Sequence, residues 1–223
     1  MEQSIHNSND GSHTVFSSKF GAHYHSVYGA IEESIHVFIS AGIFFKYNKG
    51  SKDISIFEMG FGTGLNAYLS IIESQKLDIT IDYHSIESDP VVSDIYNKLN
   101  YPEVLNQDDP SLFTNLHTSP WENQQKITPH FNLTKYKGDI QAHKFGKQFD
   151  IIFFDAFAPS CQAHLWQKEL HQKLFDILKP NGILVTYCTQ GAFKRLLKSM
   201  GYKLDILNGP AKKREMVRAI KSK

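Results

Sequence analysis

Apolar positions along the chain follow two patterns that succeed each other several times. Short apolar runs of the kind that form buried strands end in glycine, aspartate or a polar turn. Strand-like stretches of this kind occur at residues 53–60, 78–88, 131–139, 149–159 and 182–189. Stretches with apolar residues at helical spacing separate or follow them, at residues 65–74, 91–101, 164–178 and 191–201. This alternation predicts an α/β fold, with a mostly parallel sheet and helices on both of its faces.

The two ends of the chain and one internal stretch depart from this alternation. Residues 1–15 are polar and are expected to be a disordered tail, before a single domain at 16–223. Residues 102–130 are rich in Asn, Asp, Pro and Gln and are expected to form an insertion with a short helix. Residues 202–210 and 214–221 have the pattern of a terminal antiparallel hairpin.

The composition indicates a globular protein and argues against several other classes. The chain has 223 residues, of which 41% are hydrophobic, enough for a sizeable core. Cys161 and Cys188 form no CxxC pair, so neither a zinc site nor a disulfide framework is indicated, and a cytoplasmic location is expected. His23, His25 and His36 lie close in sequence but lack a metal-binding spacing, so we expect no metal. No secretory signal or membrane-spanning run is visible, and no membrane partner is expected.

The run EMGFGTGLN, residues 58–66, carries a chemical signal. An acid, Glu58, ends the first predicted strand, and three glycines follow at alternate positions. Glycine permits a tight turn and lets a ligand approach the backbone, while the next helix points its N–H groups at the same spot. A pyrophosphate favours GxGxxG, whereas GxGxG after an acid suits a ligand with an ammonium or sulfonium group, such as S-adenosylmethionine. The expected cofactor contacts in this run are Glu58, Gly60, Phe61, Gly62, Thr63, Gly64 and Asn66.

Two more acids follow the next two predicted strands. Glu87 stands where a carboxylate can accept both hydroxyls of an adenosine ribose, although an exposed loop acid has the same pattern. Asp139 follows the third strand and is a candidate for the adenine amino group, although Gly-Asp is also a common turn. Both are expected to face the glycine turn, because ligands bind beyond the carboxyl ends of parallel strands.

The segment FFDAFAP provides a candidate catalytic residue. Asp155 follows four apolar residues and precedes Phe157 and Pro159, which would form an apolar lip of a substrate site. A carboxylate there can orient an attacking nitrogen and help its proton leave. The alternative is a helix N-cap, where aspartate is also common.

Four motifs together resemble one family of enzymes. FEMGFGTGLN, FDIIFFDAFAP, TYCTQGAFKRLLKSMGY and KKREMVRA occur in the order found in the MnmC/MnmD group of tRNA methyltransferases. The resemblance runs from about Phe20 to Ala219 and implies a Rossmann-like class I methyltransferase with a seven-stranded, mostly parallel sheet. It implies conversion of 5-aminomethyl-2-thiouridine to 5-methylaminomethyl-2-thiouridine at the tRNA wobble position. Some members continue into an FAD-dependent oxidase domain, but this chain ends soon after KKREMVRA, so we expect a stand-alone form without FAD.

The resemblance also implies a tRNA partner, which the charge distribution favours. Residues 194–223 hold ten basic and two acidic residues, whereas the remainder holds fourteen basic and twenty-one acidic ones. A solvated Lys-rich tail would have the same composition. Lys212, Lys213 and Arg214 are candidates for phosphate contacts near the anticodon loop, and Phe157 and Trp166 for stacking on a base. A monomer is expected.

Two other functions stay open at this point. A small-molecule or protein N-methyltransferase, or an aminopropyl transferase of the same fold, would carry the same glycine turn. A non-catalytic RNA-binding module is a third possibility, which the full set of Glu58, Glu87 and Asp155 disfavours.

Overall fold

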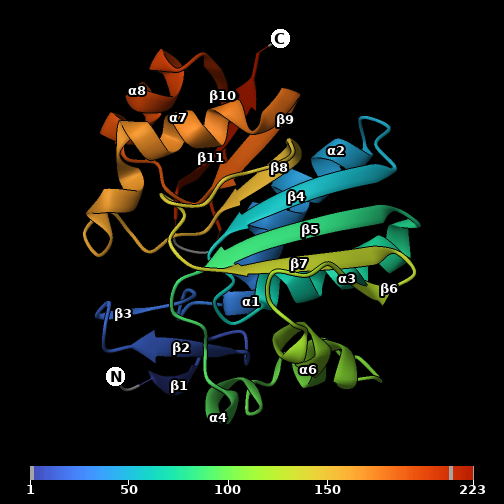
Figure 1. Ribbon diagram of the computed structural model, residues 1–223. Helices are drawn as coiled ribbons and strands as arrows, with labels where there is room; N and C mark the ends of the chain where they lie inside the picture. Colours follow the sequence, from blue (N-terminus) through green and yellow to red (C-terminus); the bar gives the residue numbers. More distant parts are fainter. Residues whose placement is uncertain (1–2, 211–212, 223) are drawn as a thin grey trace.

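The computed structural model describes residues 3–210 and 213–222, so Lys212 lies outside the described part of the chain. The main sheet of the described residues has the strand order β10-β11-β9-β8-β4-β5-β7-β6 (Figure 1). Its parallel members are β4 (Asp53–Met59), β5 (Thr80–Glu87), β7 (Phe131–Lys137), β8 (Phe149–Phe154) and β9 (Leu178–Thr186). The strands that pair antiparallel to their neighbours are β6 (Gln125–Thr128), β10 (Tyr202–Asn208) and β11 (Glu215–Lys221).

The order of the strands reverses at β4, and this reversal positions the site. The chain moves outward from β4 to β5 and β7 on one side, and to β8 and β9 on the other. The loops after β4, β5 and β8 therefore leave the same edge of the sheet around one crevice. The sheet has eight strands in place of the predicted seven, because the insertion at 102–130 adds β6 along the outer edge of β7.

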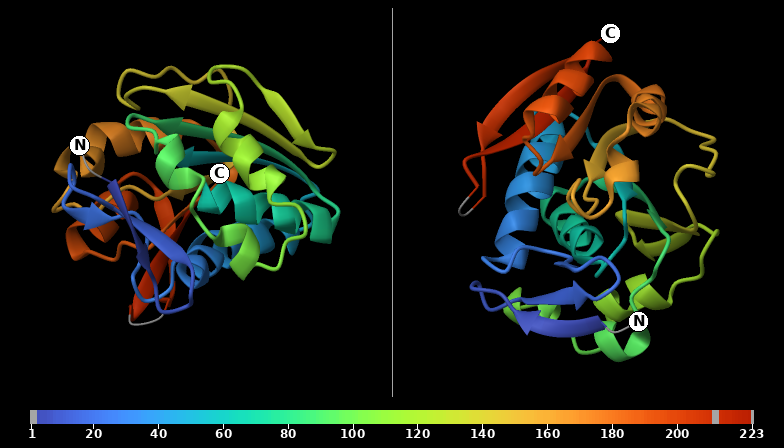
Figure 2. Two further views of the ribbon diagram at one scale, coloured as in Figure 1. Left: turned by 90° about the horizontal axis from the view of Figure 1, so that it is seen from below. Right: turned by 90° about the vertical axis from the view of Figure 1, so that its left-hand side faces the viewer.

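Helices cover both faces of the sheet, as the continuous apolar runs predict (Figure 2). Ile151 and Phe153 of β8 face one core, and Ile152 and Phe154 face the other. The helices of the first core are α1 (Ala30–Ser34), η1 (Ile35–Phe44), α2 (Phe45–Tyr47) and α3 (Leu65–Leu77). The helices of the second core are η2 (Ala163–Trp166), α7 (Lys168–Asp176) and α8 (Gly191–Ser199).

The prediction that residues 1–15 are disordered is wrong for the described residues of that stretch. They form most of a three-stranded antiparallel sheet made of β1 (Gln3–Asn7), β2 (His13–Ser17) and β3 (Ala22–His23). Polar side chains hold its first turn, where Asp10 accepts hydrogen bonds from the hydroxyls of Ser8 and Ser12. The low hydrophobicity of this stretch led to the prediction of disorder. Pairing of the backbone between strands and these local hydrogen bonds stabilise the hairpin without a large apolar core.

The insertion braces the glycine turn from outside the crevice. It includes the end of α5 (Tyr101–Val104), α6 (Ser111–Thr118) and β6, and it follows the short helix α4 (Ser93–Tyr96). His117 of α6 stacks on Tyr96, with ring centres 4.2 Å apart, and its Nε2 lies 3.1 Å from the carbonyl oxygen of Thr63. Within the described part of the chain, no helix combines the length and apolar character needed to cross a membrane.

Candidate active site

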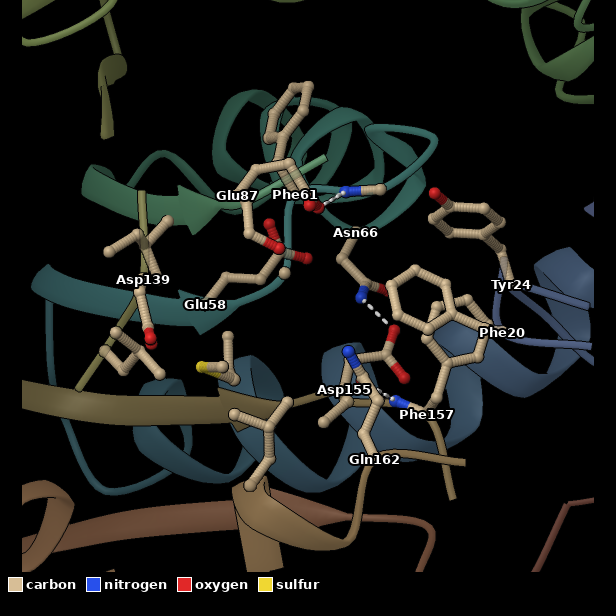
Figure 3. A pocket seen from close by; sticks show the side chains of 18 of the residues that line it. Phe20, Tyr24, Glu58, Phe61, Asn66, Glu87, Asp139, Asp155, Phe157 and Gln162 are labelled. Carbon is tan, nitrogen blue, oxygen red and sulfur yellow. Dashed lines mark hydrogen bonds between the residues drawn. The ribbon is translucent and has the colours of Figure 1, made fainter. Parts of the chain in front are cut away.

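A cavity of about 950 Å³, including its open mouth, lies at the carboxyl ends of β4, β5, β7 and β8 (Figure 3). Its walls come from the glycine turn, from the ends of these strands and from the loop after β3. The residues predicted for the cofactor or for catalysis that line it are Glu58, Gly60, Phe61, Gly62, Asn66, Glu87, Asp139, Asp155 and Phe157. These residues therefore lie together around one cavity, and their roles toward a ligand stay a prediction.

The glycine turn needs its glycines for both conformation and space. Gly60, Gly62 and Gly64 all have positive φ, at 87°, 51° and 75°. A Cβ on Gly62 would also lie 3.0 Å from the Tyr24 ring, which packs over the turn. Gly64 precedes α3, so the first N–H groups of this thirteen-residue helix begin at the cavity.

Glu58 is buried in the wall of the cavity, and one of its oxygens has no hydrogen-bond partner in the described part of the chain. Only 1% of the residue is exposed, and its Oε2 has no hydrogen-bond partner among the described residues. Burial raises its pKa well above the ordinary value, and the nearby charge of Asp155 raises it further. A buried carboxylate with a free oxygen is suited to a cationic ligand group such as an ammonium.

Glu87 connects the end of β5 to the glycine turn. Its Oε2 accepts a hydrogen bond of 3.0 Å from the Gly62 N–H, and its Oε1 accepts one of 2.7 Å from the Asp89 N–H. Each carboxylate oxygen has a second lone pair, so Glu87 can still accept two hydroxyl groups. Asp139, by contrast, is exposed at the rim, where its Oδ1 accepts the Gln141 N–H.

Asp155 lies at the junction of this cavity with a second one. Its Oδ2 accepts a hydrogen bond of 2.8 Å from Asn66 Nδ2, which comes from the first turn of α3 (Figure 3). Burial raises the pKa of Asp155 to about 7, with a further contribution from the negative charge of Glu33. The carboxyl group can therefore exchange a proton near neutral pH.

The second cavity, of about 1110 Å³ with its mouth, adjoins the first through Tyr24, His25, Asp155, Ala156 and Phe157. Its other walls are formed by β3 and the loop that follows it, by α1, by the loop after β8, and by the segments after β9 and before β11. They include Val27, Tyr28, Glu33, Cys161, Tyr187 and Lys213. The two cavities therefore adjoin each other, and Asp155 lies in the wall that they share.

Phe157 is held rigidly at this junction. Its ring stacks on Phe20, with centres 4.7 Å apart, and meets the edge of Tyr24 at 5.0 Å (Figure 3). Its N–H donates to Gln162 Oε1, and its carbonyl oxygen accepts the Trp166 indole N–H at 3.0 Å. Trp166 itself is buried in the second core, so it positions Phe157 and offers no open face to a base.

Several residues predicted for the site do not line either cavity. Thr63 is fully buried, and its hydroxyl lies 2.7 Å from His25 Nε2. Gly64 shapes the turn from behind, and Pro159 lies outside both linings. Arg214 is exposed beyond the second cavity, and Lys212 lies outside the described residues.

The structure adds residues that the sequence did not assign to the site. Phe20, Tyr24 and His25 come from the N-terminal segment, Glu33 from α1 and Tyr187 from the end of β9. The family resemblance begins at about Phe20 and therefore includes this segment, but neither spacing nor composition indicates which of its side chains face the crevice. The histidines near it have separate partners, and the described residues include no group of three or more metal-binding side chains.

The fold is a Rossmann-like α/β fold with a cavity at the carboxyl ends of its parallel strands, and comparison with known proteins identifies the family. The profile of a family described as S-adenosyl-L-methionine-dependent methyltransferase matches residues 111–222, about half of the chain. The chain belongs to this family, and its strand order is that of a class I methyltransferase.

Two curated relatives carry the name tRNA 5-methylaminomethyl-2-thiouridine biosynthesis bifunctional protein MnmC. The chain is 27% identical over 221 residues to the one from Burkholderia thailandensis and 29% identical over 211 residues to the one from Pseudomonas putida. The matches cover 92% and 87% of this chain, but 33% and 32% of the relatives. The chain therefore spans about a third of the length of the curated relatives it matches.

Solved structures agree on the fold. The crystal structure of MNMC2 from Aquifex aeolicus aligns with a TM-score of 0.79 and 23% identity, over 98% of this chain and 69% of that one. CalS10, an amino pentose methyltransferase from Micromonospora echinaspora, aligns with a TM-score of 0.52 and 9% identity, over 87% and 93% of the two chains. Its structure contains bound S-adenosylmethionine.

Proposed function

We propose that this chain methylates the primary amine of 5-aminomethyl-2-thiouridine at the wobble position of tRNA, with S-adenosylmethionine as methyl donor. The observation that carries the proposal is the position of Asp155, whose carboxyl group lies between a cofactor-sized cavity and a second cavity open to solvent. The names of the MnmC relatives supply the substrate class.

The first cavity has donors and acceptors that fit S-adenosylmethionine. The free, buried Oε2 of Glu58 suits the ammonium of the methionine part, and the two remaining lone pairs of Glu87 suit the ribose hydroxyls. Asp139 at the rim is our candidate for the adenine amino group. When bound, the cofactor supplies an electrophilic methyl group on a sulfonium sulfur.

Asp155 prepares the acceptor for attack. An alkylamine is protonated at neutral pH, and only the neutral form has a free nitrogen lone pair. With a pKa of about 7, Asp155 can take the proton from the acceptor and return it to solvent after transfer. The aromatic group of Phe20, Tyr24 and Phe157 beside it excludes water and fixes the direction of approach.

We propose that the second cavity receives the wobble base and that the basic C-terminal segment contacts the RNA backbone. Some basic side chains of this segment have partners within the protein. Arg218 pairs with Asp205, and Lys221 Nζ donates to the carbonyl oxygens of Phe175 and Leu178. Arg214 is exposed directly before β11, and it is a candidate for phosphate contact.

Arg214→Ala is expected to weaken tRNA binding and to lower the slope of log K against log salt by about one, because each phosphate contact releases roughly one counterion. Fluorescence anisotropy over a salt series measures this slope. Lys76→Ala is the matched control, since Lys76 is exposed at the far end of α3 from the cavity. Equal slopes for the two variants would place the RNA surface elsewhere.

Analysis of tRNA nucleosides tests the proposed function in cells. A strain that lacks this protein should accumulate the aminomethyl form of the wobble uridine, and restoring the gene should return the methylated form. Unaltered wobble uridines in the deletion strain would favour a small-molecule or protein amine as the acceptor instead.

A further inference from the structure

Lys213 inserts an alkylammonium group into the second cavity. Its Nζ forms an ion pair with the Glu33 carboxylate and lies 4.2 Å from the centre of the Tyr187 ring. Only 11% of the Glu33 side chain is exposed, whereas 41% of the Lys213 side chain is. The buried Glu33 carboxylate and the face of the Tyr187 ring therefore form a cradle for a cation, which the more exposed side chain of Lys213 occupies with its ammonium group.

The parts of this cradle are held by the protein independently of Lys213. The Ser26 N–H donates to Glu33 Oε2 at 3.1 Å, and Glu33 lies on α1, whose neighbouring residues are buried in the first core. The Tyr187 hydroxyl donates to the carbonyl oxygen of Ala156 at 2.8 Å, which fixes its ring beside the segment that carries Asp155. The lysine is the exposed partner, and it can leave without disturbing these two contacts.

The cradle and Asp155 belong to the same compartment. Both Glu33 and Asp155 line the second cavity. The negative charge of Glu33 raises the pKa of Asp155, after burial the first cause of that shift. The second cavity leads to the outside, and the first cavity lies on the other side of Asp155. An amine that enters from solvent would reach the Glu33 cradle on its way to Asp155.

We infer that Glu33 is a second carboxylate of the acceptor site: it binds the ammonium form of the acceptor amine, in the place that Lys213 Nζ takes in this structure, and holds it beside Asp155. This inference rests on the proposed function, because it assumes an amine acceptor. The two acids then have different roles. Glu33 captures the cation, and Asp155 removes its proton before the attack.

Burial and the charges of the neighbouring groups set the pKa of Asp155. Burial and Glu33 raise its pKa to about 7, while Asn66 and the positive charge of Lys213 lower it. The titratable and charged groups that face it are Glu33 from α1, Glu58 from β4, Tyr83 from β5, Tyr187 after β9, and Lys213 before β11. His25, after β3, lines the same compartment and is kept neutral by burial, which lowers its pKa to about 4.

Glu33→Gln has two expected effects in steady-state methylation of tRNA. The KM for tRNA rises about tenfold, because the amide cannot form a charge-assisted contact with an ammonium. The acidic limb of the profile of kcat/KM against pH moves to lower pH, because removing a negative neighbour lowers the pKa of Asp155. Calorimetry should give unchanged S-adenosylmethionine affinity, since Glu33 does not line the first cavity.

Glu32→Gln is the matched control, because Glu32 is exposed on the same helix and the substitution removes the same charge. Glu33→Asp keeps the charge and should restore most of the pH profile even where Glu33→Gln lowers stability. If Glu33→Gln and Glu32→Gln share one KM and one pH profile, or if Glu33→Asp fails to restore the profile, Glu33 has only a structural role.

Lys213→Gln should move the acidic limb in the opposite direction, to higher pH, because it removes the positive neighbour of Asp155. Lys76→Gln is its control, since Lys76 is also paired with a glutamate, Glu73, but lies away from the cavity. Shifts in the same direction for Lys213→Gln and Glu33→Gln would overturn the inference.

Direct titration of the Asp155 carboxyl carbon by NMR separates this inference from the proposed function. We expect the pKa of Asp155 to fall in Glu33→Gln and to rise in Lys213→Gln, without any substrate present. If the wild-type protein leaves the tRNA amine unmethylated, the proposed function fails. If it methylates the amine and Glu33→Gln does so with wild-type KM and pH profile, the inference on Glu33 fails alone.

Discussion

Asp155→Asn is expected to lower kcat by a factor of about 100 to 10,000, while the affinity for S-adenosylmethionine changes by less than about twofold. Positioned proton transfer contributes rate factors of this size, and the amide cannot accept a proton from an ammonium. The amide keeps the shape of the side chain and can still accept the Asn66 Nδ2–H, so the cofactor cavity should keep its form. Single-turnover methylation of tRNA measures the rate, and calorimetry measures the affinity.

Asp53→Asn is a suitable control for this variant. Asp53 is exposed at the start of β4, at the opposite edge of the sheet from Asp155, and its loss should leave kcat unchanged. Turnover of Asp155→Asn within a few-fold of the wild-type rate would mean that another group or water removes the proton. The proton-transfer role of Asp155 would then have to be abandoned.

Glu87→Ala is expected to weaken S-adenosylmethionine binding about a hundredfold. The substitution removes both proposed ribose contacts, each a hydrogen bond to a charged group. It also leaves the Gly62 N–H, which now donates to Glu87 Oε2, without its partner in the turn that holds the cofactor. Glu87→Gln keeps one acceptor oxygen and should show a smaller loss, of about tenfold.

Calorimetry on both variants tests this expectation, with Glu103→Ala as a control because Glu103 is exposed on α5. A melting temperature near the wild-type value would show that the loss arises at the ligand and not from unfolding. Wild-type affinity in a folded Glu87→Ala protein would remove Glu87 from the ribose site and leave it a role in the turn alone.

The sequence predicted the sheet and the position of the first cavity because both depend on local signals. A strand buried on both faces needs a continuous apolar run, and β8 carries one from Ile151 to Phe154. The turn after β4 needs positive φ at Gly60, Gly62 and Gly64, so its glycines could be recognised without a structure. Topology then brought Glu87 and Asp155 to the same edge as that turn.

The second cavity could not be predicted in the same way, because its walls come from segments that are far apart in the sequence. Glu33 precedes Asp155 by more than a hundred residues and lies on a helix whose apolar pattern only indicates core packing. Its place in the second cavity depends on its ion pair with Lys213, whose Nζ also lies over the Tyr187 ring, and on η1, which continues α1 and packs against β9 and β11. Phe20 lies between β2 and β3 and Tyr24 directly follows β3, so both are positioned by the small N-terminal sheet, whose first residues were expected to be disordered because they are polar.

The most direct test of the account is methylation in a defined mixture of purified protein, S-adenosylmethionine and tRNA that carries 5-aminomethyl-2-thiouridine at the wobble position. Mass spectrometry of the digested nucleosides follows the base. We predict that the aminomethyl nucleoside is replaced by one that is heavier by a single CH₂ group on the side-chain nitrogen, and that Asp155→Asn forms this product at least about 100 times more slowly. An unchanged wobble nucleoside, or a methyl group found at another position, would contradict the account.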